Sequence, residues 1–219
     1  MPAKYLHGEK IAKAAAALIL IDVINDFDFP EASELLKQAI PAARCIRRLK
    51  AKAKAAGMPV IYANDNFGRW RSDFTRLVKH CLASESRGKP IVELLQPDTD
   101  DYFVLKPKHS GFYCTALEVL LNDLGVQTVI LAGFSTNICV LFTANDAYLR
   151  DLKVIVPRDC VAANTVSEND AALSQIERIL KAETRLHSKL NLKTLSRHGR
   201  QTSRQRNRAN RRVAASKPR

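Results

Sequence analysis

Three residues far apart in the sequence carry side chains that together could perform nucleophilic chemistry. Asp22 directly follows one apolar stretch, Lys106 follows another, and Cys139 comes soon after a third. A carboxylate can take the proton of a thiol, and a nearby ammonium stabilises the thiolate, which is the nucleophilic form of cysteine. We therefore consider these three residues as a candidate active site.

Each of the three residue types also has an ordinary structural interpretation. An aspartate after a buried strand often anchors a loop, a lysine at a strand end is usually solvated, and a cysteine near a helix start usually packs as a small apolar side chain. A helix start favours the thiolate, because free N–H groups and partial positive charge gather there. The position of Cys139 therefore strengthens the catalytic interpretation.

Alternating segments supply the elements that would position these side chains. Continuous apolar stretches predict buried parallel strands, and a helical spacing of apolar residues predicts the helices between them. We expect strands at residues 15–23, 58–63, 102–105, 128–132 and 153–156, and helices at 31–56, 114–124, 138–149 and 167–181. The predicted fold class is α/β, in three α/β/α layers with a mainly parallel sheet.

Some details of this pattern are specific enough to test. Pro41 is expected to begin a new helical segment, and Ser167 to cap the last helix. Residues 64–96 are polar and aromatic, and we expect them to supply substrate contacts. Active sites of open α/β sheets lie at the carboxyl ends of the strands, where the three candidate residues are expected to converge.

Three motifs resemble those of a known family. They are residues 17–27 (ALILIDVINDF), 106–112 (KPKHSGF) and 133–140 (GFSTNICV), the last continuing to residue 147. In this order they resemble the opening, lysine and nucleophile motifs of the isochorismatase-like cysteine hydrolases. The resemblance covers roughly residues 15–180 and leaves the C-terminal end outside.

The resemblance implies a catalytic triad of Asp22, Lys106 and Cys139. Lys106 is preferred to Lys108 because it stands six residues before Phe112, the spacing of the family motif.

The resemblance also implies a non-proline cis peptide bond between Phe134 and Ser135. This bond would direct the backbone N–H of Ser135 beside that of Cys139, so that the two form an oxyanion hole.

The implied activity is hydrolysis of a C–N bond (amide, ureido or carbamoyl) in a small molecule, through a thioester on the cysteine. Two alternatives stay open. One is vinyl-ether hydrolysis of the isochorismatase type, which needs the aspartate but no nucleophilic cysteine. The other is a nucleic-acid-associated or scaffolding protein on an inactive hydrolase fold. The presence of Cys139 and of all three triad residues favours C–N hydrolysis.

We expect no metal and no other cofactor. Nicotinamidases of the family hold a metal through an Asp-x-His motif and a later histidine, whereas Asn66 stands here where a histidine would be. His80 alone is a poor metal site and is interpreted as a surface or packing residue. His109, in the lysine motif, is expected to have no catalytic role.

Polar and aromatic side chains near the motifs are the candidate substrate-binding residues, namely Phe27, Asn66, Trp70, Phe112 and Tyr113. Phe27 and Phe112 could equally belong to the core. Arg69 and Arg71 flank Trp70, and they either attract a substrate carboxylate or contact a neighbouring subunit.

The net charge of +13 is concentrated near the C-terminal end. Residues 181–219 hold 13 lysines and arginines against one acid, whereas the rest of the chain holds 22 against 21. We predict a hydrolase domain at residues 1–184 and a basic tail at 185–219 that is disordered because it is too polar to fold. The tail has no aromatic residues to stack on bases, so any attraction to nucleic acid or an anionic surface would be non-specific.

The sequence also limits where the protein acts. It has no apolar run of the about 20 residues that span a bilayer, and no secretory signal. The five cysteines lack the spacing of a disulfide framework, and Cys45, Cys114 and Cys160 are interpreted as packing residues. We expect a cytoplasmic protein without membrane insertion, acting on a small-molecule substrate. Because family members commonly form dimers or tetramers, we also expect a homo-oligomer.

Overall fold

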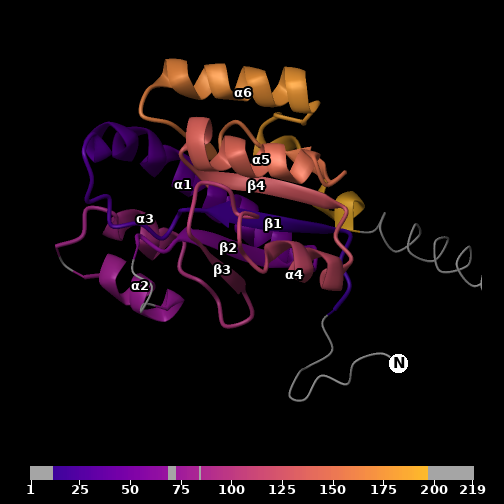
Figure 1. Cartoon of the computed structure of the whole chain (residues 1–219), viewed down its shortest axis with the longest axis horizontal. Helices are drawn as coiled ribbons and strands as arrows, with labels where there is room; N and C mark the ends of the chain where they lie inside the picture. Colours follow the sequence, from indigo (N-terminus) through magenta and orange to yellow (C-terminus); the bar gives the residue numbers. More distant parts are fainter. Residues whose placement is uncertain (1–11, 69–72, 84, 197–219) are drawn as a thin grey trace, which may run out of the picture.

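The computed structural model describes residues 12–68, 73–83 and 85–196, which form a layered α/β fold (Figure 1). Its strands are β1 (Ala16–Ile21), β2 (Val60–Asp65), β3 (Tyr102–Lys106), β4 (Thr128–Phe134), β5 (Lys153–Ile155) and β6 (Val161–Ala162). Their order is β3-β2-β1-β4-β5, with β6 paired to β4, and the pairs are parallel. The predicted fold class is therefore confirmed.

Helices cover both faces of the sheet. They are α1 (Ala32–Ala55), α2 (Phe74–Cys81), α3 (Lys89–Leu94), α4 (Leu117–Leu124), α5 (Leu141–Tyr148) and α6 (Val166–Leu180), with a π-helical turn η1 (Thr136–Val140) and a 3₁₀ turn η2 (His187–Lys189). One core cluster joins the sheet to α1, α2 and α3, and a second joins it to α4, α5 and α6. Figure 1 shows α5 and α6 stacked over the β4 side of the sheet.

The central strand β1 shows why the sheet is apolar throughout. Leu18 and Leu20 belong to the cluster on the α1 side, whereas Ile19 and Ile21 belong to the cluster on the α4 side. Successive side chains of a strand point to opposite faces, and both faces are covered here. All four side chains are fully buried, as the continuous apolar stretch predicts.

Pro41 lies inside α1, so the prediction that it begins a new helical segment is wrong. A proline inside a helix costs about 3 kcal/mol through the lost hydrogen bond and a clash with the preceding turn. Ala39, Ala43 and Ile46 are fully buried on either side of it, and this packing keeps the helix continuous.

The cap of α6 also differs from the prediction. Thr165, not Ser167, precedes the helix, and its hydroxyl accepts a hydrogen bond from the backbone N–H of Glu168 at 3.2 Å. The Glu168 carboxylate in turn accepts from the backbone N–H of Thr165 at 3.0 Å. This reciprocal pair is a capping box, and a threonine three residues before a glutamate is its sequence signal.

The packed part of the chain continues beyond the predicted boundary at residue 184. Leu192 is buried in the cluster on the α1 side, and Leu190 and Leu195 pack against it. His187, in η2, is also buried. The first residues of the predicted tail therefore belong to the folded body, because their apolar side chains pack against the core cluster on the α1 side. The remainder, residues 197–219, lies outside the described residues.

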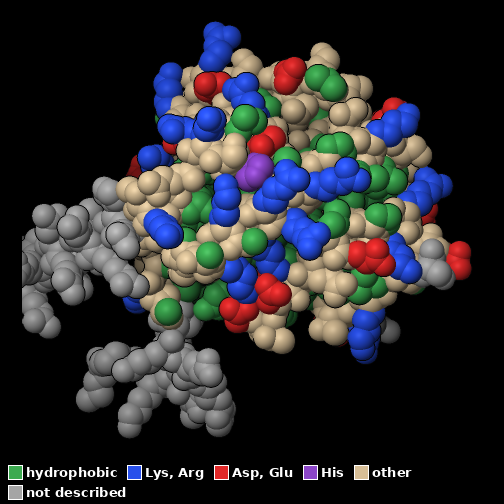
Figure 2. All heavy atoms as spheres, turned by 180° about the vertical axis from the view of Figure 1, so that it is seen from behind, with side chains coloured by type: hydrophobic (Ala, Val, Ile, Leu, Met, Phe, Trp, Pro, Cys, Tyr) green, Lys and Arg blue, Asp and Glu red, His purple; other side chains and the backbone are tan. Residues whose placement is uncertain are grey.

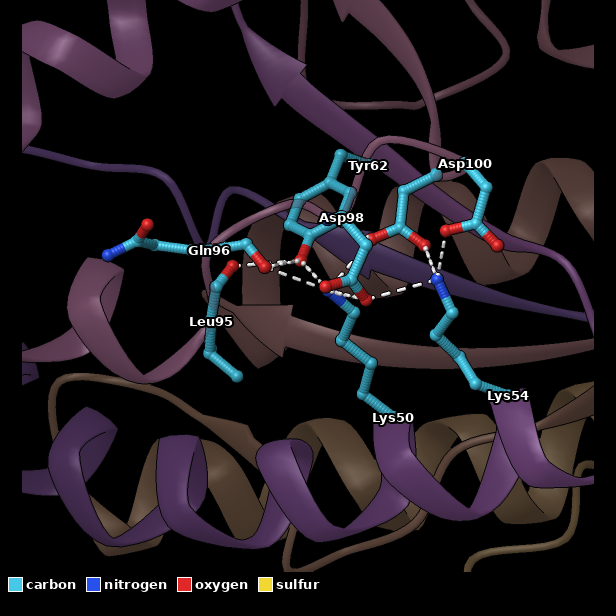
Figure 3. Close-up of polar contacts among 8 residues, drawn as sticks. Lys50, Lys54, Tyr62, Leu95, Gln96, Asp98 and Asp100 are labelled. Carbon is cyan, nitrogen blue, oxygen red and sulfur yellow. Dashed lines mark hydrogen bonds and ion pairs between the residues drawn. The ribbon is translucent and has the colours of Figure 1, made fainter.

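A buried polar cluster joins α1 to the loop before β3 (Figure 3). The Lys50 ammonium contacts the Tyr62 hydroxyl at 3.0 Å, the Gln96 carbonyl at 2.8 Å and the Asp101 carboxylate at 2.7 Å. The Lys54 ammonium lies 3.0 Å from Asp98. A buried ammonium is tolerated only when its charge is paired, so this cluster fixes the loop that leads into β3.

The surface of the body carries charges of both signs. Figure 2 shows lysine and arginine side chains spread over one face, with fewer acidic side chains and scattered apolar ones among them. Among the described residues, no helix has both the length and the apolar character that crossing a membrane requires.

Candidate active site

The topology of the sheet brings the three candidate residues to one edge. Asp22 directly follows β1, Lys106 ends β3, and Cys139 lies in η1, just after β4. The chain passes from β1 to β2 on one side of the sheet, whereas β4 pairs with β1 on the other. Such a reversal of strand order opens a crevice at the carboxyl ends of the strands.

Gly133 allows β4 to approach β1 closely at this edge. It pairs with Ile21 and has a φ of 131°. A Cβ atom at this position would lie 2.0 Å from the Ile21 carbonyl oxygen, so only glycine fits. The end of β4 is thereby held against the end of β1, which places the turn with Cys139 beside Asp22.

Lys106 stands between the other two side chains. Its ammonium nitrogen lies 2.8 Å from Asp22 Oδ2 and 3.5 Å from the Cys139 sulfur, and the lysine is fully buried. The Asp22 carboxylate and the Cys139 thiol shift each other's pKa, so the two groups lie close together. A thiol, a carboxylate and an ammonium are therefore gathered at this edge of the sheet.

Asp65, at the end of β2, holds the aspartate and the lysine in place. Its backbone N–H donates to Asp22 Oδ1 at 2.7 Å, and its carboxylate lies 3.7 Å from the Lys106 ammonium. Asp22 itself has a φ of 52°, a left-handed conformation that is uncommon outside glycine and that aspartate tolerates better than most residues. Asp65 was not among the predicted site residues. Its signal in the sequence is that it closely follows the predicted strand at residues 58–63, much as Asp22 follows β1.

Burial sets the resting protonation of the site. It raises the pKa of the Asp22 carboxyl above the ordinary value of 3.8, although Lys106 and the Cys139 thiol lower it in part. Burial and the Asp22 charge raise the pKa of the Cys139 thiol, and Lys106 offsets only a part of this. For Lys106, burial alone would lower the pKa, but the charges around it, led by Asp22, raise it. The free protein therefore holds a thiol and an ammonium, and not the anionic sulfur that the helix start suggested.

The turn that carries Cys139 is fixed at both ends. The peptide bond between Phe134 and Ser135 is cis, at the position that the resemblance implies. The Ser135 carbonyl accepts from the N–H of Val140 at 3.1 Å, the wide i→i+5 pattern of a π-helical turn. Such turns occur frequently at functional sites.

Thr143 connects the nucleophile turn to the lysine motif. Its hydroxyl donates to the Cys139 carbonyl at 2.7 Å and accepts from the backbone N–H of Gly111 at 3.0 Å. The threonine is fully buried. A single hydroxyl thus fixes the two segments that present Cys139 and Lys106.

His109 lies closer to the site than expected. Its Nδ1 atom is 4.0 Å from the Cys139 sulfur, and its ring packs against Phe142 with 5.5 Å between the ring centroids. The signal in the sequence was its place in the lysine motif, three residues after Lys106.

The candidate substrate-binding residues lie in different environments. Phe27 and Phe112 are core residues with 0% and 5% exposure, and Phe27 packs edge-on against Phe134, which favours the alternative that they belong to the core. Tyr113 is exposed, and Asn66 lines a cavity of about 260 Å³ beside Asp65. Trp70 and its neighbours Arg69 and Arg71 lie outside the described residues.

The residues at the place of the nicotinamidase metal do not fit a metal ion. The side-chain oxygens of Asp65 and Asn66 each accept from the backbone N–H two residues further on, at 2.6 and 2.9 Å. His80 Nε2 lies 2.9 Å from the Asp26 carboxylate, with the side chain 45% exposed. Because Asp65 also faces the Lys106 ammonium, a cation there would be repelled, and we derive no step through a metal.

The parallel α/β fold thus brings a thiol, a carboxylate and an ammonium together at one edge of the sheet. The sequence matches the isochorismatase domain family over residues 16–185. The chain therefore belongs to the isochorismatase family and is a hydrolase of that family.

Three relatives illustrate the similarity. The chain is 42% identical over 173 residues to YaaI of Bacillus subtilis, an uncharacterized isochorismatase family protein, with 79% of this chain and 94% of the relative covered. It is 30% identical over 190 residues to the ureidoacrylate amidohydrolase RutB of Methylobacterium radiotolerans, with 75% and 74% covered. The crystal structure of N-carbamoylsarcosine amidase from Thermoplasma acidophilum superposes with a TM-score of 0.62 at 26% identity, with 81% and 99% covered.

Proposed function

We propose that this protein hydrolyses a C–N bond of a small ureido, carbamoyl or amide compound through a thioester on Cys139. The observation that supports this most is the position of the Lys106 ammonium, 2.8 Å from Asp22 and 3.5 Å from the Cys139 sulfur. The names of two relatives, an amidohydrolase of ureidoacrylate and an amidase of carbamoylsarcosine, agree with a ureido or carbamoyl group as the target.

The first half of the proposed reaction forms the thioester. Asp22 takes the proton of the Cys139 thiol, while Lys106 stabilises the thiolate that results. The sulfur attacks the carbonyl carbon, and the backbone N–H groups of Ser135 and Cys139 stabilise the oxyanion. The C–N bond breaks as Asp22 passes the proton to the leaving nitrogen, which departs as ammonia or an amine.

The second half releases the acid. A water molecule gives a proton to Asp22 and attacks the thioester carbonyl, and the same oxyanion hole holds the charge. The C–S bond breaks, and the sulfur leaves as a thiolate beside Lys106 and regains the proton from Asp22. The product is a carboxylic or carbamic acid, and the resting thiol is restored.

A substrate screen tests this proposal. Amides, ureido acids and carbamoyl compounds are incubated with the wild type and with Cys139→Ala, and ammonia or amine release is measured. We expect Cys139→Ala to lose activity on the order of 10⁴-fold or more, because the nucleophile is gone. Cys114→Ala serves as the control, because Cys114 is an exposed free thiol. Equal turnover by Cys139→Ala and the wild type would refute the covalent route.

We also propose self-association and a binding role for the basic end of the chain. Phe142 on α5 and Leu149, the residue that follows α5, are 51% and 75% exposed, which supports a contact with a second copy. Light scattering coupled to gel filtration would give the number of copies.

Binding of total RNA to filters at two salt concentrations would test the basic residues, because phosphate contacts weaken steeply with salt.

A further inference from the structure

A second group of reactive side chains lies apart from the three candidate catalytic residues. Cys45 on α1, Asp159 after β5 and His187 in η2 place one potential ligand atom each within 4.8 Å of the others. These residues come from three distant parts of the sequence, and none of them takes part in the proposed hydrolysis. We propose that Cys45, Asp159 and His187 form a zinc site.

The carboxylate and the imidazole are already oriented toward each other. Asp159 Oδ2 lies 2.6 Å from His187 Nδ1, and Asp159 Oδ1 accepts from the backbone N–H of His187 at 2.9 Å. The two side chains are 22% and 8% exposed. Two contacts between the same residues hold the donor atoms rigidly, which reduces the ordering that a metal would otherwise require.

The donor set matches the preference of zinc. Nitrogen, oxygen and sulfur ligands together suit Zn²⁺, which binds them at about 2.0–2.3 Å in a tetrahedron. Such donor atoms lie about 3–4 Å apart around the metal. The Asp159 and His187 atoms, now 2.6 Å apart, would therefore separate by about 0.5 Å, and the Cys45 sulfur, within 4.8 Å of both, would close in by at most about 1 Å. Cys45 is only half-buried, so its side chain can rotate inward and water can take the fourth position.

The charges balance when zinc binds. The Cys45 thiol loses its proton to solvent, and the proton that His187 shares with Asp159 moves to Nε2. One thiolate, one carboxylate and a neutral imidazole then surround a divalent cation, so that the net charge of this partly buried group is zero. A bound metal would thus take the place of the proton between His187 Nδ1 and Asp159 Oδ2.

One comparison favours a metal at these residues. The other group of three possible ligands in the described part of the chain, Asp98, Asp100 and Asp101, is already paired with the ammonium groups of Lys50 and Lys54. The cluster around Cys45 has no such lysine contact in the described structure.

A cobalt titration of the full-length protein tests the site. Co²⁺ bound to a thiolate gives an intense near-ultraviolet charge-transfer band, which zinc should abolish by displacement. We expect the band in the wild type and in Cys139→Ala, and its loss in Cys45→Ser. Cys160→Ser is the matched control. The Cys160 thiol donates a hydrogen bond to Asp159 at 3.7 Å, but Cys160 is not one of the three proposed zinc ligands. No band in the wild type, or a band that survives Cys45→Ser, would overturn the proposal.

A second measurement uses only the wild-type chain. Alkylation of each cysteine by iodoacetamide is followed by peptide mass spectrometry with and without zinc. We expect zinc at about ten times its dissociation constant to slow alkylation of Cys45 about tenfold, because only the free form reacts. The exposed Cys114 should react at an unchanged rate. Equal slowing of both cysteines, or of neither, would contradict a site at Cys45.

Discussion

Asp22 is the residue whose environment determines when the proposed reaction can start. Its side chain is buried beside the Lys106 ammonium and near the Cys139 thiol. A base is most effective when its pKa is close to the working pH, and burial moves the pKa of Asp22 upward in that direction. The same burial raises the pKa of the Cys139 thiol, which favours its protonated form in the free protein.

The raised pKa predicts the acid side of the pH profile. Protonated Asp22 cannot accept the thiol proton, so kcat/KM should fall as the pH drops through the raised pKa of Asp22. We expect the midpoint of this fall above 3.8, the ordinary value for aspartate, when an uncharged amide substrate is used. The measurement is kcat/KM from acid to neutral pH. Asp170→Asn, at an exposed position on α6, should leave the profile unchanged, and a midpoint at or below 3.8 would contradict this account.

The buried hydroxyl of Thr143 connects two of the segments that form the candidate site. Thr143 on α5 bonds to the Cys139 carbonyl and to the Gly111 N–H, so it sets the distance between the nucleophile turn and the lysine motif. Thr143→Val keeps the shape of the side chain but removes both hydrogen bonds.

We expect Thr143→Val to lower kcat about 10- to 100-fold, because small misplacements of reacting groups are costly, while KM changes little. Thr143→Ser retains the hydroxyl and should restore most of the rate. Steady-state kinetics of the two variants give the answer, with circular dichroism to show that both are folded. A Thr143→Val enzyme with wild-type kcat would show that the connection has no effect on the reaction.

The elements also show which features the sequence could predict. The apolar stretches predicted each strand of the main sheet order to within a few residues, because burial on both faces leaves an unmistakable pattern. The continuity of α1 through Pro41 was not predictable, since it depends on packing against the sheet. In the site, Asp22, Lys106 and Cys139 were found from strand ends and motifs. For Phe27 and Phe112 the sequence left pocket and core open, because spacing does not show which of the two an aromatic side chain faces; the structure places both in the core.

At the scale of the whole molecule, the segment after α6 is part of the fold. Leu192 is 5% exposed in the core cluster on the α1 side, and His187 of the proposed zinc site belongs to the same segment. The sequence did not predict this, because the many lysines and arginines of this region give it the composition of a disordered segment despite its few leucines.

Leu192→Ala should therefore destabilise the protein by about 2–4 kcal/mol through the cavity it leaves. Ile179→Ala removes the same number of carbon atoms from a side chain on α6 that is 62% exposed, and it should change the free energy of unfolding by no more than about 0.5 kcal/mol. Urea denaturation of the two variants compares them directly. Equal stability of both would mean that the segment does not belong to the core.

The central claim is that Cys139 bonds covalently to the carbonyl carbon of the substrate, with Asp22 and Lys106 beside it. Its most direct test is a quenched single-turnover reaction with the best substrate of the screen, followed by peptide mass spectrometry. We predict that the peptide with Cys139 carries the acyl or carbamoyl group of the substrate at short times and loses it as product appears. Turnover with no adduct on this peptide, or with an adduct on another cysteine, would contradict the claim.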